Sequence, residues 1–202
     1  MFVTFEGIDG SGKTTQAALL AESLREDGRE VLLLREPGGT PLGERLREVL
    51  LEGPEMTAWA EAALFAAARA DLVARVIRPA LENGATVICD RDLDSSLVYQ
   101  GLARGLGVDP VYELNMAATG GLLPEKTFVL LLDPEASRAR MTGEPDRIES
   151  EDDAFRRRLD DGYRKIVAMF PERCTALDAS KPPAEIAEEV RDELARVGAR
   201  AA

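Results

Sequence analysis

One stretch near the amino terminus has residue types and a spacing that predict phosphate binding. Residues 7–14 satisfy G-x-x-x-x-G-K-[ST], the pattern of a phosphate-binding loop. Glycines let the backbone curl so that successive N–H groups point at an anion, and a helix that starts near Lys13 adds its positive dipole end. In such loops the lysine reaches the β- and γ-phosphates, and the Thr14 hydroxyl suits Mg²⁺. The residues predicted to bind a nucleotide here are Gly7, Ile8, Asp9, Gly10, Ser11, Gly12, Lys13, Thr14 and Thr15.

Two further polar clusters contain arginine and follow apolar runs. Arg35-Glu36-Pro37 follows residues 31–34, and Asp90-Arg91 follows residues 86–89. Since the chain has no histidine, mechanisms that use a histidine base or a histidine metal ligand are excluded. A phosphate acceptor needs no such base, because its second pKa of about 6 leaves it ionised at neutral pH. Transfer to it depends instead on positioning and positive charge, so these residues favour phosphoryl transfer between phosphates.

Other proteins with phosphate-binding loops include GTP-dependent switches and large ATPase motors. The guanine-reading sequence Asn-Lys-x-Asp is absent from the chain, which disfavours a small GTPase. No apolar strand is followed by Asp-Glu, which disfavours a large ATPase. What remains is transfer of a phosphoryl group to a small acceptor.

The apolar pattern predicts the elements that position these clusters. Strands are expected at residues 2–6, 31–34, 86–89, 127–132 and 174–177, and the second of them is expected to be buried. Helices are expected from the loop to Gly28, at 41–51, at 57–83 with a kink or split at Pro79, from 94, at 109–119, at 155–170, and at 186–197. This alternation predicts an α/β fold, a parallel sheet flanked by helices on both faces. Ligands bind beyond the carboxyl ends of such strands, where each polar cluster lies.

Composition limits the other possibilities. The 202 residues are expected to form one domain, residues 1–202. A net charge of −12 disfavours non-specific binding of nucleic acid or of an anionic membrane. No run reaches about 18 apolar residues and no leader precedes the first strand, so we expect a cytoplasmic protein with no membrane partner. Cys89 and Cys174 lie in apolar runs and are expected to be buried thiols.

Four motifs together resemble bacterial thymidylate kinases, in the order of that family. They are Glu6-Gly7-x-Asp9-Gly10-x-Gly12-Lys13-Thr14-Thr15, Arg35-Glu36-Pro37-Gly38-Gly39-Thr40, Asp90-Arg91-x-x-x-Ser95-Ser96-x-x-Tyr99-Gln100 and Asp146-Arg147-Ile148-Glu149. The resemblance implies transfer of the γ-phosphoryl group of ATP to dTMP with Mg²⁺, giving dTDP. It also implies the five-stranded parallel core of the P-loop nucleoside-monophosphate kinases, a mobile lid near residues 138–150, and a homodimer.

Carried over by position, the resemblance also implies roles for individual residues. Phe65 would stack on thymine, Arg69 would donate to thymine O4, and Ser96 would meet the N3 edge. Tyr99 would crowd the 2′ carbon and so disfavour ribose. On the pattern alone, core packing is the better interpretation of Phe65, and a core tyrosine fits Tyr99 equally well. The substrate-binding residues implied in this way are Glu36, Pro37, Phe65, Arg69, Arg91, Ser95, Ser96, Tyr99 and Gln100, and the metal ligands are Thr14 and Asp90.

Members of this family differ in the source of the arginine that acts in the transition state. Here Gly10 and Ser11 leave Lys13 as the only cation in the phosphate loop. The resemblance therefore assigns the arginine to the lid, and our hypothesis is that Arg140 approaches the β/γ bridge. The predicted catalytic residues are Asp9, Lys13, Arg91, Arg140 and Arg147, and Arg138 is predicted to bind ATP. The family usually has an aromatic residue or histidine where this chain has Asp92.

Two alternatives stay open beside a dTMP kinase. One is a kinase that acts on a different small molecule, such as another nucleotide. The other is a nucleotide-dependent binding protein that keeps the loop and has lost transfer. The presence of Lys13, Thr14, Asp90 and Arg91 argues against the second alternative.

Overall fold

A computed structural model describes the backbone of residues 1–142 and 144–201. Side chains are described for the same residues as far as 196. Position 143 of the predicted lid lies outside the described residues, and so does the side chain of Val197, the last apolar residue of the predicted 186–197 helix.

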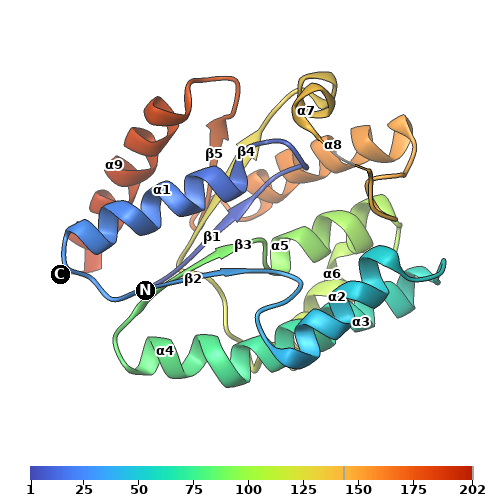
Figure 1. Ribbon diagram of the computed structural model, residues 1–202, viewed down its shortest axis with the longest axis horizontal. Helices are drawn as coiled ribbons and strands as arrows, with labels where there is room; N and C mark the ends of the chain where they lie inside the picture. Colours follow the sequence, from blue (N-terminus) through green and yellow to red (C-terminus); the bar gives the residue numbers. More distant parts are fainter. Residues whose placement is uncertain (143, 202) are drawn as a thin grey trace.

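Five parallel strands form the centre of the molecule (Figure 1). They are β1 (Phe2–Glu6), β2 (Val31–Arg35), β3 (Thr86–Asp90), β4 (Lys126–Leu131) and β5 (Cys174–Asp178). Their order in the sheet is β2-β3-β1-β4-β5, and each neighbouring pair is parallel. This sheet confirms the predicted fold class. Because β1 lies between β3 and β4, the loop after β1 emerges at the middle of the carboxyl edge.

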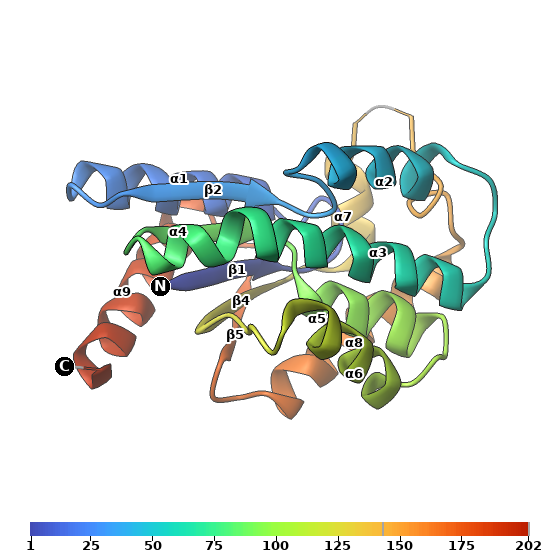
Figure 2. The ribbon, with the colours of Figure 1, turned by 90° about the horizontal axis from the view of Figure 1, so that it is seen from below.

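Helices cover both faces of the sheet (Figures 1 and 2). They are α1 (Lys13–Glu26), α2 (Pro41–Glu52), α3 (Ala58–Leu72), α4 (Arg78–Glu82), α5 (Leu93–Ser96), α6 (Val108–Thr119), α7 (Pro134–Arg140), α8 (Asp153–Met169) and α9 (Pro183–Ala201), with π-helical turns η1 (Val73–Ile77) and η2 (Leu97–Ala103). In the part of the chain that the structure describes, no helix has the length and apolarity needed to cross a bilayer.

The two faces of the sheet have separate cores. Val3 and Phe5 of β1 pack with residues of α1 and α9, whereas Phe2 packs with residues of α3 and η1. Since successive side chains of a strand point to opposite faces, Glu6 points to the same face as Phe2. A carboxylate is thereby directed into the layer formed by α3, α5, η2, α6 and α8. Cys89 and Cys174 are buried, as predicted.

One element departs from the prediction, and one predicted interruption is present. The β2 strand was expected to be buried, but it lies at one edge of the sheet, and the side chain of Leu33 is 38% exposed. The predicted interruption near Pro79 is present as the π-helical turn η1, between α3 and α4. The physical reason is that proline lacks an N–H and its ring crowds the carbonyl four residues earlier, so the regular helical hydrogen bonding shifts there.

Candidate active site

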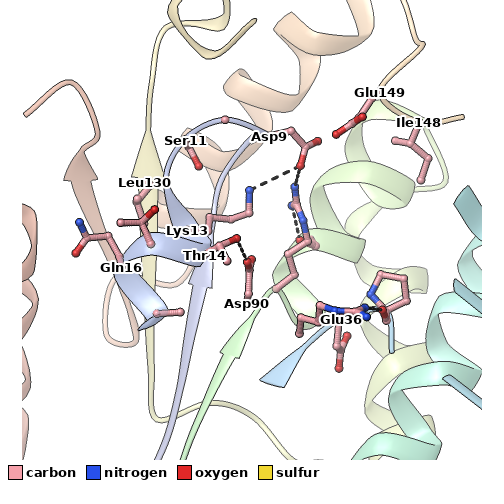
Figure 3. A pocket seen from close by; sticks show the side chains of 18 of the residues that line it. Asp9, Ser11, Lys13, Thr14, Gln16, Glu36, Asp90, Leu130, Ile148 and Glu149 are labelled. Atoms are coloured by element: carbon pink, nitrogen blue, oxygen red, sulfur yellow. Dashed lines mark hydrogen bonds and ion pairs between the residues drawn. The ribbon is translucent and has the colours of Figure 1, made fainter. Parts of the chain in front are cut away.

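A cavity of about 1040 Å³ opens at the carboxyl edge of the sheet. Its walls come from the loop after β1, the residues that follow β2 and β3, and residues of α3, α7 and α9 with the segments next to them. Figure 3 shows the side chains of Asp9, Lys13, Thr14 and Asp90 converging in this pocket. The polar clusters that were predicted to meet at one edge therefore share one cavity.

The backbone of the phosphate loop needs glycine at two close approaches. Gly7 has φ +139°, and a Cβ there would lie 2.5 Å from the carbonyl oxygen of Leu130. Gly10 has φ +77°, and a Cβ there would lie 2.5 Å from the carbonyl oxygen of Ser137 in α7. The hydroxyl of Ser137 also donates to the carbonyl oxygen of Asp9. The loop is thus confined between β4 and the start of the lid region, which the motif alone does not reveal.

Lys13 and Arg91 both form ion pairs with the carboxylate of Asp9. Lys13 Nζ is 3.8 Å from Asp9 Oδ1 and donates to the Ile8 carbonyl at 2.9 Å, while an Arg91 nitrogen donates to the same Oδ1. Burial opposes ionisation of Asp9, but Arg91 and Lys13 outweigh burial and hold its pKa below the usual range. Burial and the neighbouring Arg91 lower the pKa of Lys13. The three side chains form a charged centre that brings two cations together.

Arg91 is held by several acceptors from distant parts of the chain. Its Nη1 donates to the carbonyl of Gly7 at 3.1 Å, to Ser95 Oγ at 3.1 Å and to the hydroxyl of Tyr163 at 3.0 Å. Its guanidinium also lies 5.3 Å from the ring centroid of Tyr99. Its backbone adopts φ +73°, an uncommon conformation for a residue with a side chain. These contacts orient the guanidinium toward the phosphate loop.

Glu6 binds the residues that hold Arg91. It was not among the predicted site residues. Its carboxylate accepts from the amide of Asp92 at 2.8 Å, from the hydroxyl of Ser95 at 2.6 Å and from the hydroxyl of Tyr163 at 3.1 Å. Burial and the nearby Asp94 raise the pKa of Glu6 to about 7. The hydroxyls that hold Arg91 are therefore themselves held by Glu6.

Thr14 and Asp90 meet across the sheet edge. The Thr14 hydroxyl donates to Asp90 Oδ2 at 2.5 Å, although 76 residues separate them in sequence. Figure 3 shows this pair beside the Lys13 side chain. Both predicted metal ligands thus lie together and offer oxygen atoms, the donors that Mg²⁺ prefers.

Arg69 is 1% exposed and does not form part of the cavity wall. Its Nη2 is 2.7 Å from Glu36 Oε2, and its Nε is 3.0 Å from Asp92 Oδ1. Its Nη1 donates to Ser96 Oγ at 3.1 Å and to the side chain of Asn115. Burial raises the pKa of Glu36 to about 8 against the opposing effect of Arg69. Asp92, where the family pattern has another residue type, is explained here as a partner of Arg69.

The other predicted substrate residues surround the cavity next to this buried cluster. Glu36 lies at the wall with one carboxylate oxygen, Oε1, that meets no hydrogen-bond donor among the described residues. The remaining predicted substrate residues in the wall are Pro37, Phe65, Arg91, Ser95, Ser96, Tyr99 and Gln100. One face of the cavity therefore combines an aromatic ring with buried polar groups, as expected of a site that selects a heterocycle.

The three arginines predicted for the lid have different partners. Arg140, the last residue of α7, lies in the cavity wall and donates to the Ala179 carbonyl at 3.1 Å. Arg138 is exposed and pairs with Asp153. Arg147 lies 2.8 Å from Glu61 and donates to the Leu50 carbonyl at 2.8 Å. Of the three, Arg140 alone lines the cavity in the described part of the chain.

The structure brings most of the predicted nucleotide-binding residues into one wall. Those in the wall are Asp9, Gly10, Ser11, Gly12, Lys13, Thr14 and Thr15, with Asp90 from the metal pair. The predicted residues outside it are Gly7, Ile8, Arg69, Arg138 and Arg147. Residues that sequence reasoning missed include Glu6, Glu61, Ser137 and Tyr163. For Glu6, the available signal was an acidic residue inside an apolar strand that is buried on both faces.

Comparison with known proteins agrees with the motifs and the fold. A family model described as thymidylate kinase matches residues 5–190. A thymidylate kinase of Exiguobacterium is 47% identical over 196 residues, covering 95% of this chain and 92% of the relative. One of Deinococcus radiodurans is 47% identical over 193 residues, covering 94% of each chain. The crystal structure of thymidylate kinase from Ehrlichia chaffeensis has a TM-score of 0.80 and 35% identity, over 96% of this chain and 98% of that one. This chain therefore belongs to the thymidylate kinase family.

Proposed function

We propose that this protein transfers the γ-phosphoryl group of ATP to dTMP, which gives dTDP and ADP. The observation that carries the proposal is the position of Lys13 and Arg91 on one carboxylate, Asp9, inside one cavity. A donor phosphate and an acceptor phosphate repel each other, so a site that transfers between them must hold two anions close together. Lys13 and Arg91 supply a cation for each.

The phosphates of ATP would bind the loop, and the acceptor phosphate would bind opposite. Backbone N–H groups of residues 10–15, the amino-terminal end of α1 and Lys13 serve the β- and γ-phosphates. Arg91 holds the phosphate of dTMP, and its fixed hydrogen bonds limit the reorganisation needed when charge develops. Asp9 sets the position of both cations and lies where it can orient the 3′-hydroxyl of the sugar.

We place the thymine base against Phe65, with Ser96 and Gln100 at its polar edge. Arg69 donates to Ser96 Oγ, so in this proposal Arg69 contributes to base recognition through Ser96. The carboxylate oxygen of Glu36 that has no donor among the described residues provides a further acceptor at the same wall. The ring of Tyr99 would exclude a 2′-hydroxyl. An amino group in place of the thymine O4 would leave buried polar groups unmatched and weaken binding.

The oxygens of Thr14 and Asp90 fit Mg²⁺ as a further part of the proposal. Mg²⁺ is commonly held by one or two protein oxygens together with water and substrate phosphates. The chemistry that such an ion would supply is neutralisation of the charge on the phosphates of ATP. Thr14 and Asp90 would hold the ion through their side-chain oxygens.

We assign the transition-state arginine to Arg140. The assignment is supported by the partners of the other two arginines, since Arg138 and Arg147 are paired with carboxylates outside the cavity wall. Among the described residues, the Arg140 side chain makes one hydrogen bond, to a backbone carbonyl. A small movement of the proposed lid, residues 138–150, would release that bond and bring the guanidinium to the β/γ bridge.

We further propose that the protein is a homodimer. Large apolar side chains are exposed on α2 and α3, namely Leu42, Val49 and Trp59. Multi-angle light scattering of the purified chain should give a mass near 44 kDa, about twice the 21.9 kDa of one chain. A mass of one chain at micromolar concentration would contradict this part of the proposal.

A coupled ADP-release assay tests the activity. With ATP and Mg²⁺, dTMP should be turned over fastest, followed by dUMP, with dCMP and AMP far slower. Faster turnover of dCMP or AMP would support a kinase for another nucleotide. No turnover with any acceptor, together with ATP binding by calorimetry, would support a binding protein that has lost transfer.

A further inference from the structure

Glu61, in the first turn of α3, is a buried carboxylate that the proposed chemistry does not use. Its side chain is 2% exposed. It accepts from Gln100 Nε2 at 2.9 Å, from Arg104 at 3.2 Å through two nitrogens, and lies 2.8 Å from Arg147 Nη2. Burial raises the pKa of Glu61, but these donors outweigh burial and lower it. A buried charge of this kind is stable only while its partners stay in place.

Arg147, one of these partners, belongs to residues 146–151, a segment that contributes to the cavity wall on the side of the proposed lid. Asp146, Ile148 and Glu149 lie in the cavity wall, whereas Arg147 between them turns away toward Glu61. Arg147 is also bound through its backbone N–H to the Leu51 carbonyl at 3.0 Å. Figure 3 shows Ile148 and Glu149 at the edge of the pocket, with Glu149 beside Asp9 of the phosphate loop. The Glu61–Arg147 contact therefore fixes the back of a segment whose front faces the ligand.

The other partners belong to the wall that we assign to thymine. Gln100 donates to Glu61 and lies in the cavity wall. Phe65 is one helical turn beyond Glu61 on the same face of α3 and lies in the same wall. Arg104 joins Glu61 to Glu151 and packs 4.6 Å from the ring centroid of Phe155 at the start of α8. One carboxylate thus joins α3, η2 and both ends of the 146–151 segment.

We propose that Glu61 is a positioning residue that couples the segment 146–151 to the base-facing wall of the acceptor site. Removing its charge would take from Arg147 the carboxylate partner it has among the described residues, and would leave Arg104 with Glu151. The segment would then loosen, and the Gln100 amide would keep only a neutral acceptor in place of a charged one. The inference rests on the proposed function only for the identity of the nucleotide whose binding suffers.

The experiment compares Glu61→Gln with Glu193→Gln. Glu193 of α9 pairs with the buried Lys126 at 2.7 Å, away from the cavity, so its loss also breaks an ion pair. For Glu61→Gln we expect KM for dTMP to rise about tenfold or more, while KM for ATP changes less than about twofold. Hydrogen exchange of the amides of residues 147–151 should quicken about tenfold or more. Glu193→Gln should change neither quantity.

A double-mutant cycle with Arg147→Met tests whether the link itself is responsible. If Glu61 acts through Arg147, the double variant should be little worse than either single variant for KM and for exchange. Unchanged exchange and unchanged KM in Glu61→Gln would overturn the proposal. A lower melting temperature with equal loss for both substrates would also overturn it, since that result describes a structural role only.

Two further measurements test the proposal if Glu61→Gln does not fold or if the protein does not phosphorylate dTMP. If Glu61→Gln does not fold, Arg147→Met must by itself quicken exchange at residues 148–151 and raise KM for dTMP, and failure to do so contradicts the proposal. If the unmodified protein does not phosphorylate dTMP, the proposed function fails, and the exchange measurement still tests the coupling independently.

Discussion

The two sides of the cavity supply positive charge in different ways. On the phosphate-loop side the charge comes from backbone N–H groups, the end of α1 and one lysine, Lys13. On the side of the proposed lid, three arginines occur within ten residues, namely Arg138, Arg140 and Arg147. Their partners are Asp153, the Ala179 carbonyl and Glu61, respectively. The first side is determined locally by glycines and helix geometry. The second side depends on which partner each side chain meets, so residue type alone does not assign a role there.

The largest effect is expected from Arg140, whose replacement tests the lid side of this comparison. Replacing Arg140 by alanine should lower kcat about 10³-fold, because an arginine that neutralises the transferring phosphoryl group acts mainly in the transition state. Steady-state kinetics at saturating ATP and dTMP measure the change. Arg164→Ala, which removes an exposed arginine of α8 paired with Asp160, is the control and should leave kcat unchanged. A wild-type kcat in Arg140→Ala would remove Arg140 from the mechanism.

The next effect concerns the stability of the acceptor side. Arg69→Met should lower the free energy of unfolding by about 3 kcal/mol, because Glu36 and Asp92 would stay buried without their cation. Urea denaturation measures this value. Arg75→Met, which breaks an exposed pair with Asp71, should cause no measurable loss. Equal stability of the two variants would show that the buried cluster does not support the wall.

On the loop side, the hydroxyl of Thr14 can be removed without loss of charge. Thr14→Ala should raise the Mg²⁺ concentration for half-maximal activity about tenfold or more, whereas Thr14→Ser, which keeps the hydroxyl, should change it little. A titration of Mg²⁺ at fixed ATP measures both variants. The same Mg²⁺ dependence in Thr14→Ala and in the unmodified protein would exclude Thr14 as a ligand.

The smallest expected effect is the pH dependence caused by Glu6. Its pKa is about 7 in the folded protein against 4.5 in its ordinary state. Between these values the folded protein keeps a proton that the unfolded chain has released, so this group lowers the free energy of unfolding as the pH rises. Glu6→Gln should remove that contribution. The loss of melting temperature from pH 5 to pH 8 should be smaller in the variant by about 5–10 °C, and an equal loss would show that Glu6 does not titrate there.

The sequence predicts the parts of the site that depend on local geometry. The loop of residues 7–15 has the glycines and the helix start that phosphate binding requires, and both appear in the structure. Thr14 and Asp90 follow from the rule that parallel strands end at one edge, and they lie 2.5 Å apart. The expected burial of β2 was wrong, because an apolar run does not reveal whether its strand will be central or at the edge.

The remaining parts depend on contacts between distant residues. Tyr163 meets Glu6 across 157 residues, and no local pattern indicates that pairing. Arg69 and Phe65 occupy successive turns of α3, yet one is enclosed by Glu36 and Asp92 while the other lies in the wall. Arg147 belongs to a motif of the family, but the direction of its side chain depends on Glu61, 86 residues earlier. The direction of each of these side chains is therefore determined by the tertiary structure and cannot be predicted from local sequence.

The contact between Gly10 and α7 has a consequence for how this family can diversify. A side chain at position 10 would have to occupy the space of the Ser137 carbonyl, at a backbone φ that residues with a Cβ rarely adopt. Moving the proposed catalytic arginine from α7 into the loop by Gly10→Arg would therefore displace the helix that carries Arg140. The two placements of the arginine exclude each other in this scaffold. A lineage that exchanges them must shift α7 and change both positions together, so intermediates with one change are expected to be inactive.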